Sequence, residues 1–341
     1  MKDLRNLTLG EMEDFVKELG EPKFRAKQVF NWIYKGVTDF RQMRNLPEVF
    51  QVKLEENSFV GTVKPVQIQK SKTDGTRKYL FELSDGNMIE SVFMKYKFGN
   101  SICLSSQAGC RMGCRFCAST RKGLERNLTA GEIISQLMAA EEDTGERIGH
   151  IVIMGTGEPF DNYDNLSRFL RIVNDKNGLN IGMRNITVST CGLVPKIEQF
   201  AHDFNQVNLA ISLHAPNNRI RSSMMPVNDS YSIEELISAC KRYTDITGRR
   251  ITFEYTLVNG VNDSDEHAEE LCRLLYGMLC HVNLIPLNKV NETGFDTVSR
   301  QRAHQFREYL ETRHIPATVR RELGADIDAA CGQLRLNNAK N

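Results

Sequence analysis

The spacing of hydrophobic residues divides this chain into three stretches. In residues 12–19 and 29–34, apolar side chains recur three and four positions apart, which places them on one face of an α-helix. From residue 62 to residue 94 the spacing falls to two, as in strands with one buried face. Asp74-Gly75 and Asp85-Gly86 lie between those runs and are typical of hairpin turns. Residues 1–95 are therefore expected to form a small N-terminal accessory domain of helices followed by β-hairpins.

From about residue 101, a third pattern repeats six times, with a short β-rich run followed by a helical run. Two of the helices carry capping boxes, Thr129 with Glu132 and Ser232 with Glu235. Such repeats predict parallel strands joined by helices, and six units are too few to close an eightfold barrel. We expect an α/β fold in which residues 96–341 form a partial (β/α)6 barrel with a C-terminal extension. The predicted strands are residues 102–105, 151–154, 186–189, 207–213, 251–257 and 282–285.

The composition is that of an ordinary globular protein. Of the 341 residues, 40% are hydrophobic and 26% are charged. The charged N-terminus does not resemble a secretory signal, and no apolar run reaches the roughly 20 residues that span a bilayer. We therefore expect a cytoplasmic protein without a membrane partner.

The net charge of +1 neither requires nor excludes a nucleic-acid partner. Any site for a polyanion must therefore be local. Basic residues in pairs more often form a solvated face than a binding site. The candidate phosphate contacts are Arg121, Lys122, Arg126, Arg249, Arg250, Arg320 and Arg321.

Three cysteines, Cys110, Cys114 and Cys117, lie within eight residues. In a chain of this kind, cysteines are expected to be thiols, ligands or catalysts rather than a disulfide framework. Thiolates favour zinc and iron–sulfur clusters. A 4Fe–4S cluster normally has four cysteine ligands, so three would leave one iron open for chemistry.

The alternative for these cysteines is a closed structural zinc site, with Cys103 or a distant residue as the fourth ligand. Zinc sites usually show two paired Cys-x-x-Cys units, and this stretch has one such pair. The spacing therefore favours the cluster.

The three cysteines follow the first predicted barrel strand and precede the first helix. In parallel α/β barrels, the active groups lie on loops after the carboxyl ends of the strands. Small polar residues follow other predicted strands too, and together they suit a ligand with ribose, amino and carboxylate groups. His214 by itself would more often be a structural histidine. These residues are Gly155, Gly157, Glu158, Ser189, Ser212, His214 and Asn288.

Glu90 falls on the same face of a predicted strand as Met88, Val92 and Met94. A carboxyl group held among apolar side chains would have a raised pKa, which suits a general base. An exposed glutamate on an edge strand fits the pattern equally well.

The cysteine spacing, followed by Gly-Thr-Gly-Glu-Pro at residues 155–159, resembles the radical S-adenosylmethionine (SAM) superfamily. Several longer sequence motifs resemble those of the RlmN/Cfr family of RNA adenine methyltransferases. Within that family, Pro159 and Ala215-Pro216-Asn217 bring the chain nearer to RlmN. The resemblance covers nearly the whole chain and implies a radical SAM barrel. These motifs are residues 104–107, 127–129, 212–217, 261–263 and 326–334.

This resemblance implies a role for each matching residue. It implies that Cys331 carries a methyl group, that Cys103 resolves the intermediate, and that Glu90 accepts a proton. SAM would chelate the open iron of a 4Fe–4S cluster. The implied cluster ligands are Cys110, Cys114 and Cys117, and the implied SAM contacts are Gly157, Glu158, Ser189, Ser212, Leu213, His214 and Asn288.

In the scheme that the resemblance implies, one SAM methylates Cys331 and a second yields the radical that activates this methyl group. The activated carbon then links the protein to carbon 2 of an adenine, which is too electron-poor to attack SAM directly. Glu90 would remove the ring proton, and Cys103 would release the product with formation of a disulfide.

The resemblance also implies partners. They are an adenosine of 23S rRNA near the peptidyl-transferase centre, the adenosine next to the anticodon in certain tRNAs, and an electron donor such as flavodoxin or ferredoxin. The target base must leave its stack to react. Two other functions stay open, a Cfr-type enzyme that methylates carbon 8 and a non-enzymatic RNA-binding protein with a structural zinc.

The sequence assigns no metal-binding or catalytic role to the remaining cysteines. Cys240 and Cys272 on predicted helices, and Cys280, are expected to be small buried hydrophobic residues. Cys191 follows the third predicted strand, so its role is open.

Overall fold

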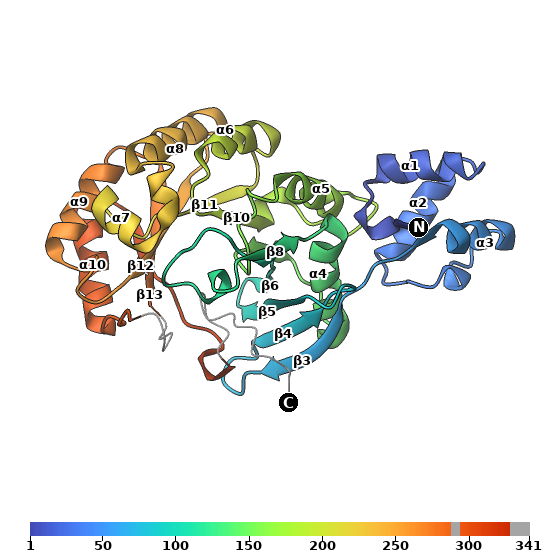
Figure 1. Ribbon diagram of the computed structural model, residues 1–341, viewed down its shortest axis with the longest axis horizontal. Coiled ribbons are helices and arrows are strands. Elements are labelled where there is room, and N and C mark those ends of the chain that lie inside the picture. Colours follow the sequence, from blue (N-terminus) through green and yellow to red (C-terminus); the bar gives the residue numbers. More distant parts are fainter. Residues whose placement is uncertain (288–293, 328–341) are drawn as a thin grey trace.

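The computed structural model describes residues 1–287 and 294–327, which form a small helical unit and a large mixed sheet flanked by helices (Figure 1). The N-terminal helices follow the predicted apolar stripes, and Met12, Phe15, Val29 and Phe30 are buried. This unit contains α1 (Leu9–Glu18), α2 (Phe24–Ile33), α3 (Glu48–Asn57), the short strands β1 (Lys2–Asp3) and β2 (Ser58–Phe59), and the 3-10 turns Leu4–Asn6 and Phe40–Gln42.

One ten-stranded sheet runs through the rest of the described chain, in the order β14-β13-β12-β11-β10-β9-β6-β5-β4-β3. Strands β3 to β6 pair antiparallel, whereas the strands from β6 to β14 are parallel to one another. The strands are β3 (Lys64–Lys70), β4 (Arg77–Glu82), β5 (Met88–Tyr96), β6 (Gly99–Cys103), β9 (His150–Ile153), β10 (Ile186–Thr190), β11 (Asn208–Ser212), β12 (Ile251–Leu257), β13 (Cys280–Pro286) and β14 (Ala317–Val319).

The predicted α/β fold with a partial barrel is confirmed, and both predicted capping boxes are present. The sequence pattern missed β14, because three residues give too short a run to show a period. The predicted hairpins pair directly with barrel strand β6, and β5 spans the proposed boundary at residue 95, which stays a prediction. The helices of this part are α4 (Ala130–Thr144), α5 (Tyr163–Asn174), α6 (Val194–Asp203), α7 (Asn218–Met224), α8 (Ile233–Thr247), α9 (Asp265–Leu275) and α10 (Arg300–Thr312).

The two faces of the parallel strands differ in character. In β12, Phe253 and Tyr255 belong to the main hydrophobic core, whereas Glu254 and Thr256 line a cavity on the other face. Side chains alternate along a strand, so the polar positions of β12 all face the inside of the barrel. The inner face is therefore available for binding, while the outer face packs against helices.

The described helices include none that is both long and apolar enough to cross a membrane. Two residues with implied roles, Asn288 and Cys331, lie outside the described residues.

Candidate active site

The three clustered cysteines lie on a loop inserted between the first barrel strand and the first barrel helix, as predicted. The loop is closed at its base by β7 (Gln107–Gly109) and β8 (Leu124–Asn127), which pair antiparallel. Cys110 N–H donates to the Gly123 carbonyl at 2.8 Å. Gly109 has φ +76°, and a Cβ there would lie 2.0 Å from the Gly123 oxygen. Only glycine fits this crossing.

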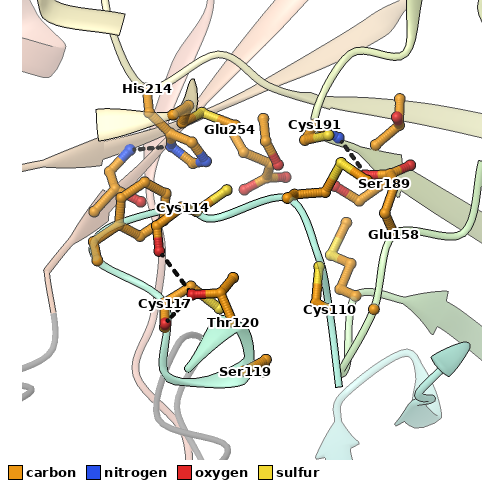
Figure 2. Close-up of a pocket in the computed structure, with 18 of the residues that line it drawn as sticks. Cys110, Cys114, Cys117, Ser119, Thr120, Glu158, Ser189, Cys191, His214 and Glu254 are labelled. Atoms are coloured by element: carbon orange, nitrogen blue, oxygen red, sulfur yellow. Dashed lines mark hydrogen bonds between the residues drawn. The ribbon is translucent and has the colours of Figure 1, made fainter. Parts of the chain in front are cut away.

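Figure 2 shows the cavity that this loop forms with the ends of the barrel strands. The cavity is partly open to solvent, and its lining combines thiols, hydroxyls and carboxylates with apolar side chains, as is usual for small-molecule sites. The loop contributes Cys110, Cys114, Cys117, Ser119 and Thr120, and the strand ends contribute Gly157, Glu158, Ser189, Cys191, Ser212, His214, Glu254, Thr256 and Arg320.

The structure therefore brings most of the predicted site residues into one cavity. Leu213 is buried below it, and its N–H donates to the Glu254 carbonyl at 3.1 Å. Phe116 lies in the cavity wall with its ring edge-on to His214, at 4.9 Å between ring centres.

The Gly-x-Gly stretch after β9 lets two chain segments meet. A Cβ on Gly155 would lie 2.7 Å from the Leu104 carbonyl oxygen, and a Cβ on Gly157 would lie 2.6 Å from the Cβ of Gln107. Gly157 also has φ +109°. The two glycines bring the Glu158 backbone against the base of the cysteine loop, where Glu158 N–H donates to the Gln107 side-chain oxygen at 2.8 Å.

Glu158 is buried, and backbone groups hold both of its carboxylate oxygens. The N–H of Phe160 donates to Oε1 at 3.0 Å, and the N–H of Cys191 donates to Oε2 at 2.7 Å. Burial raises the pKa of Glu158, while these hydrogen bonds oppose the rise. A carboxylate fixed in this way keeps further lone pairs for a positively charged ligand.

His214 is a neutral hydrogen-bonding group. Its Nδ1 accepts from the Thr256 N–H at 2.9 Å, so the ring proton is assigned to Nε2. Burial, together with the nearby charge of Arg221, lowers the pKa of His214 to about 3. The residue has φ +56°, a strained conformation that fits a functional position.

Arg221 was not found by sequence reasoning, although it braces the cavity from α7. Its side chain is fully buried and donates to the carbonyls of Cys191, at 2.6 Å, and of Ser212 and Leu213, both at 3.3 Å. One guanidinium thus joins the ends of β10 and β11. An arginine on a short helix gives no distinctive sequence signal.

Glu254 was also missed, but the sequence contained a signal for it. The strand reads Ile-Thr-Phe-Glu-Tyr-Thr-Leu, with polar residues at every second position. Glu254 accepts from the Asn283 side chain at 2.8 Å and is buried in the cavity wall. Burial raises its pKa, and the charge of Arg320 opposes this.

All three cysteine side chains of the loop line one cavity. Thiolates are the usual ligands of iron–sulfur clusters and also bind zinc. Three ligands from one loop would leave one iron of a 4Fe–4S cluster open.

Cys191 brings a fourth thiol to the cavity. Its thiol is hydrogen-bonded to Glu158, and burial raises its pKa well above the ordinary value. Cys240, Cys272 and Cys280 are buried in the main core, as predicted.

Glu90 and Cys103 lie beyond the cavity on the same inner face. Val92 of β5 is opposite Cys103 of β6, and both pack in a small apolar cluster with Met154, which also lines the cavity. Glu90 shares the face of Val92, whereas Ser91 points the other way and donates to Gln136 of α4 at 2.6 Å. The inner surface therefore continues from the cysteine loop to Glu90.

Glu90 is buried and pairs with a buried lysine. Lys78 Nζ lies 3.0 Å from Glu90 Oε1, and their side chains are 9% and 4% exposed. Burial raises the pKa of Glu90 to about 7, even though Lys78 lowers it. Glu90 is thus buried, so the exposed alternative is wrong, and its partner is a lysine rather than only the apolar side chains that were expected.

The candidate phosphate contacts are scattered over the described surface. Arg126 forms ion pairs with Asp85 and with Glu132, the latter at 2.8 Å. Arg249 donates to the Asn208 side chain, and Arg320 lines the cavity. Their contact with RNA stays a prediction.

Known proteins match this chain over its full length. Residues 104–274 match the model described as "Radical SAM superfamily", and residues 2–60 match "Ribosomal RNA large subunit methyltransferase N-terminal domain". Proteins named "Probable dual-specificity RNA methyltransferase RlmN" from Clostridium novyi and Clostridium tetani are 54% and 55% identical. The alignment covers all of this chain in both cases, and 100% and 98% of those proteins.

A solved structure agrees with these matches. The crystal structure of a radical SAM methyltransferase from Sphaerobacter thermophilus is 48% identical, with a TM-score of 0.94. The match covers 98% of this chain and 99% of that one. The chain therefore belongs to the RlmN family of the radical SAM superfamily.

Proposed function

We propose that this chain is a radical SAM RNA methyltransferase that methylates carbon 2 of adenosine 2503 in 23S rRNA and of adenosine 37 in tRNA. Its relatives are named as probable dual-specificity RNA methyltransferases, which supports two kinds of RNA substrate. The accessory hairpins, the barrel and the cysteine loop support the radical chemistry.

One observation carries the proposal. The cysteine loop and the predicted SAM contacts line a single cavity, and the inner surface of the barrel leads from this cavity to Cys103 and Glu90. A methyl group can therefore be activated at one end of a continuous surface and delivered at the other. Neither the cavity nor the hairpin strands alone contains both the proposed SAM contacts and the pair Cys103 and Glu90.

Each residue has a proposed role. Cys110, Cys114 and Cys117 hold a 4Fe–4S cluster, and Glu158 and Ser189 bind the amino-acid part of SAM. Ser212, Leu213 and His214 bind elsewhere on SAM, together with Gly157, whose backbone approaches closely, and Asn288, which lies outside the described residues. When bound, the cluster and SAM supply the electron and the methyl group, and two SAM molecules serve each turnover.

Three further residues handle the methyl group and the proton. We propose that Cys331, outside the described residues, carries the methyl group and forms a transient protein–RNA crosslink. Cys103 resolves it and forms a disulfide with Cys331. Glu90 takes the ring proton, and its pKa of about 7 suits a base near neutral pH.

Reconstituted turnover tests this function. Protein with an intact cluster, SAM and an electron donor of the flavodoxin or ferredoxin class is incubated with an rRNA fragment or a tRNA, and the nucleosides are identified by mass spectrometry. We expect 2-methyladenosine from both substrates. The Cys331→Ala variant should lose turnover and keep its cluster absorbance, and a fully active variant would contradict the mechanism.

Two other outcomes correspond to other functions. 8-Methyladenosine would identify a Cfr-type enzyme that uses the same cysteines. A colourless protein with zinc after anaerobic purification would identify a non-enzymatic RNA-binding protein. We expect a brown protein with bound iron and sulfide.

A further inference from the structure

Arg221 of α7 is a fully buried cation. Arginine stays protonated in proteins, and a buried charge is costly unless other groups balance it. Within the described part of the chain, its guanidinium donates to uncharged acceptors, which are the backbone carbonyls of Cys191, Ser212 and Leu213 and the side-chain oxygen of Asn228. These dipoles solvate the positive charge but do not neutralise it.

The ionisable groups that act on this charge are thiols. Burial lowers the pKa of Arg221, and three cysteines oppose this change, namely Cys191, Cys114 and Cys240. Cys240 is buried in the main core, and the Cys191 thiol is hydrogen-bonded to Glu158. Cys114 is the member of this group that belongs to the proposed cluster ligands, and a metal-bound cysteine is a thiolate.

The part of the cysteine loop that carries Cys114 lies against α7. Arg115 N–H donates to the carbonyl of Met224, the last residue of that helix, at 2.9 Å. Cys114 is buried in an apolar cluster that also contains Cys191 and Met224. Since the Cys191 carbonyl accepts from Arg221 at 2.6 Å, Cys191 joins the surroundings of the guanidinium to those of the Cys114 thiol.

The surroundings also fix the guanidinium in place. Gly192 has φ +104°, and a Cβ there would lie 3.2 Å from Arg221 Nη2. Asn228, which accepts from Nη1, is itself held, because its Nδ2 donates to Ser222 Oγ at 2.9 Å and to Asn218 Oδ1 at 3.1 Å. A charge fixed away from water acts on its neighbours more strongly than a surface charge does.

We propose that Arg221 stabilises the negative charge of a cluster bound through Cys114 and thereby makes this cluster easier to reduce. The cluster and its cysteine ligands rest on the proposed function. Reduction adds one electron, supplied by a donor of the flavodoxin or ferredoxin class, so a fixed positive charge nearby favours the reduced state. At an effective dielectric constant of about 20, a unit charge within about 10 Å changes the ratio of reduced to oxidised cluster by roughly tenfold or more.

The reduction potential of the cluster tests this proposal without turnover. Full-length protein with its cluster, without SAM, is titrated anaerobically with dithionite, and the reduced cluster is quantified from its electron paramagnetic resonance signal. The variants are compared at the potential that reduces half of the cluster in the unmodified protein. There, Arg221→Gln should show a reduced-to-oxidised ratio about tenfold lower, which is a shift of about 59 mV to lower potential for a one-electron couple.

Two further variants separate the charge of Arg221 from its hydrogen bonds. Arg221→Lys keeps the charge but has no planar fork to reach all of the acceptors, so it should lose stability and keep a ratio close to that of the unmodified protein. Asn228→Asp keeps Arg221 and its bonds to the strand ends, and sets a carboxylate against the guanidinium. It should lower the ratio by about threefold or more.

Arg5→Gln is the matched control for the loss of a buried arginine. Arg5 is 3% exposed and donates to Ser135 Oγ of α4 at 2.9 Å, among residues that do not line the cavity. This variant should lose stability and leave the ratio unchanged.

An unchanged ratio in both Arg221→Gln and Asn228→Asp would overturn the proposal, as would an equal fall in Arg221→Lys or in Arg5→Gln. If Arg221→Gln binds no iron, the ratio in Asn228→Asp decides. Unmodified protein that holds a reducible cluster but makes no methyladenosine would instead overturn the proposed function, whatever the potentials, and a protein that binds no cluster would overturn both.

Discussion

Glu158 at the cavity end of the inner surface and Glu90 at the hairpin end are both buried carboxylates, but they are held in different ways. In the cavity, Glu158 accepts from the backbone N–H groups of Phe160 and Cys191. Among the hairpin strands, Glu90 pairs with the side chain of Lys78 at 3.0 Å. Backbone groups thus hold Glu158, whereas the charge of one side chain, Lys78, balances that of Glu90.

This difference suits two kinds of task. Backbone N–H groups are fixed by the path of the chain, so the carboxylate of Glu158, the proposed contact for SAM, is held rigidly. Lys78 stabilises the ionised form of Glu90 against burial and leaves the pKa near 7. A carboxyl with such a pKa can take up a proton and give it back under ordinary conditions.

Glu90→Gln should have the largest effect. An amide cannot accept the ring proton, so turnover should fall by roughly 10²–10⁴-fold, the usual contribution of a general base. SAM binding, measured by calorimetry, should be unchanged because Glu90 lies outside the cavity. Glu82→Gln on the neighbouring strand β4 serves as the control, and an active Glu90→Gln enzyme would remove Glu90 from the mechanism.

Glu158→Gln should affect binding more than the proton step. Its amide group would face one of the two backbone N–H donors, and an unsatisfied buried donor costs about 1–3 kcal/mol. We expect SAM to bind roughly tenfold or more weakly and the unfolding temperature to fall. Glu141→Gln provides a matched control, because Glu141 accepts the Ile148 N–H at 2.7 Å away from the cavity. It should lose stability and keep its SAM affinity.

Lys78→Met should change the pH dependence of turnover. The positive charge of Lys78 lowers the pKa of Glu90, so its removal should raise this pKa by about one to three units. Because the ionised carboxylate is the active base, the rising limb of the pH–rate profile should move to higher pH, with most of the activity regained there. Lys78→Arg should keep the original profile. An unshifted limb in Lys78→Met would show that Glu90 is not the group that titrates.

Cys191→Ala should have the smallest effect. Its thiol is hydrogen-bonded to Glu158, so we expect iron content and turnover to stay close to those of the unmodified protein, with a stability loss of about 1 kcal/mol. Iron and sulfide analysis provides the measurement. A large loss of iron would identify Cys191 as a fourth ligand and leave the cluster without an open iron.

Much of the fold was predictable because it depends on local patterns. Capping boxes at Thr129 and Ser232 mark helix starts, and the change from helical to alternating spacing marks the hairpins. The cysteine loop was placed correctly since the order strand, loop and helix is itself a sequence pattern. The Glu90 face followed from alternation along one strand.

The remaining features depend on contacts between distant segments. Lys78 becomes the partner of Glu90 only through the register of β4 with β5, and Arg221 reaches two strand ends from a separate helix. The residues next to Lys78 and Arg221 in the sequence give no indication of these contacts. The hydrogen bond from Gly324 N–H to Asp74 is of the same kind, since the two residues are 250 positions apart.

The edge strand β3 carries features that oppose pairing with a strand of another molecule. In the described part of the chain, β3 is one edge of the ten-stranded sheet, and an unpaired edge can recruit a strand from another molecule. Pro65 removes one backbone donor from this edge, the register shifts between Pro65 and Gln67, and Lys64 and Lys70 add charge. These features make β3 a poor template for a strand from another molecule.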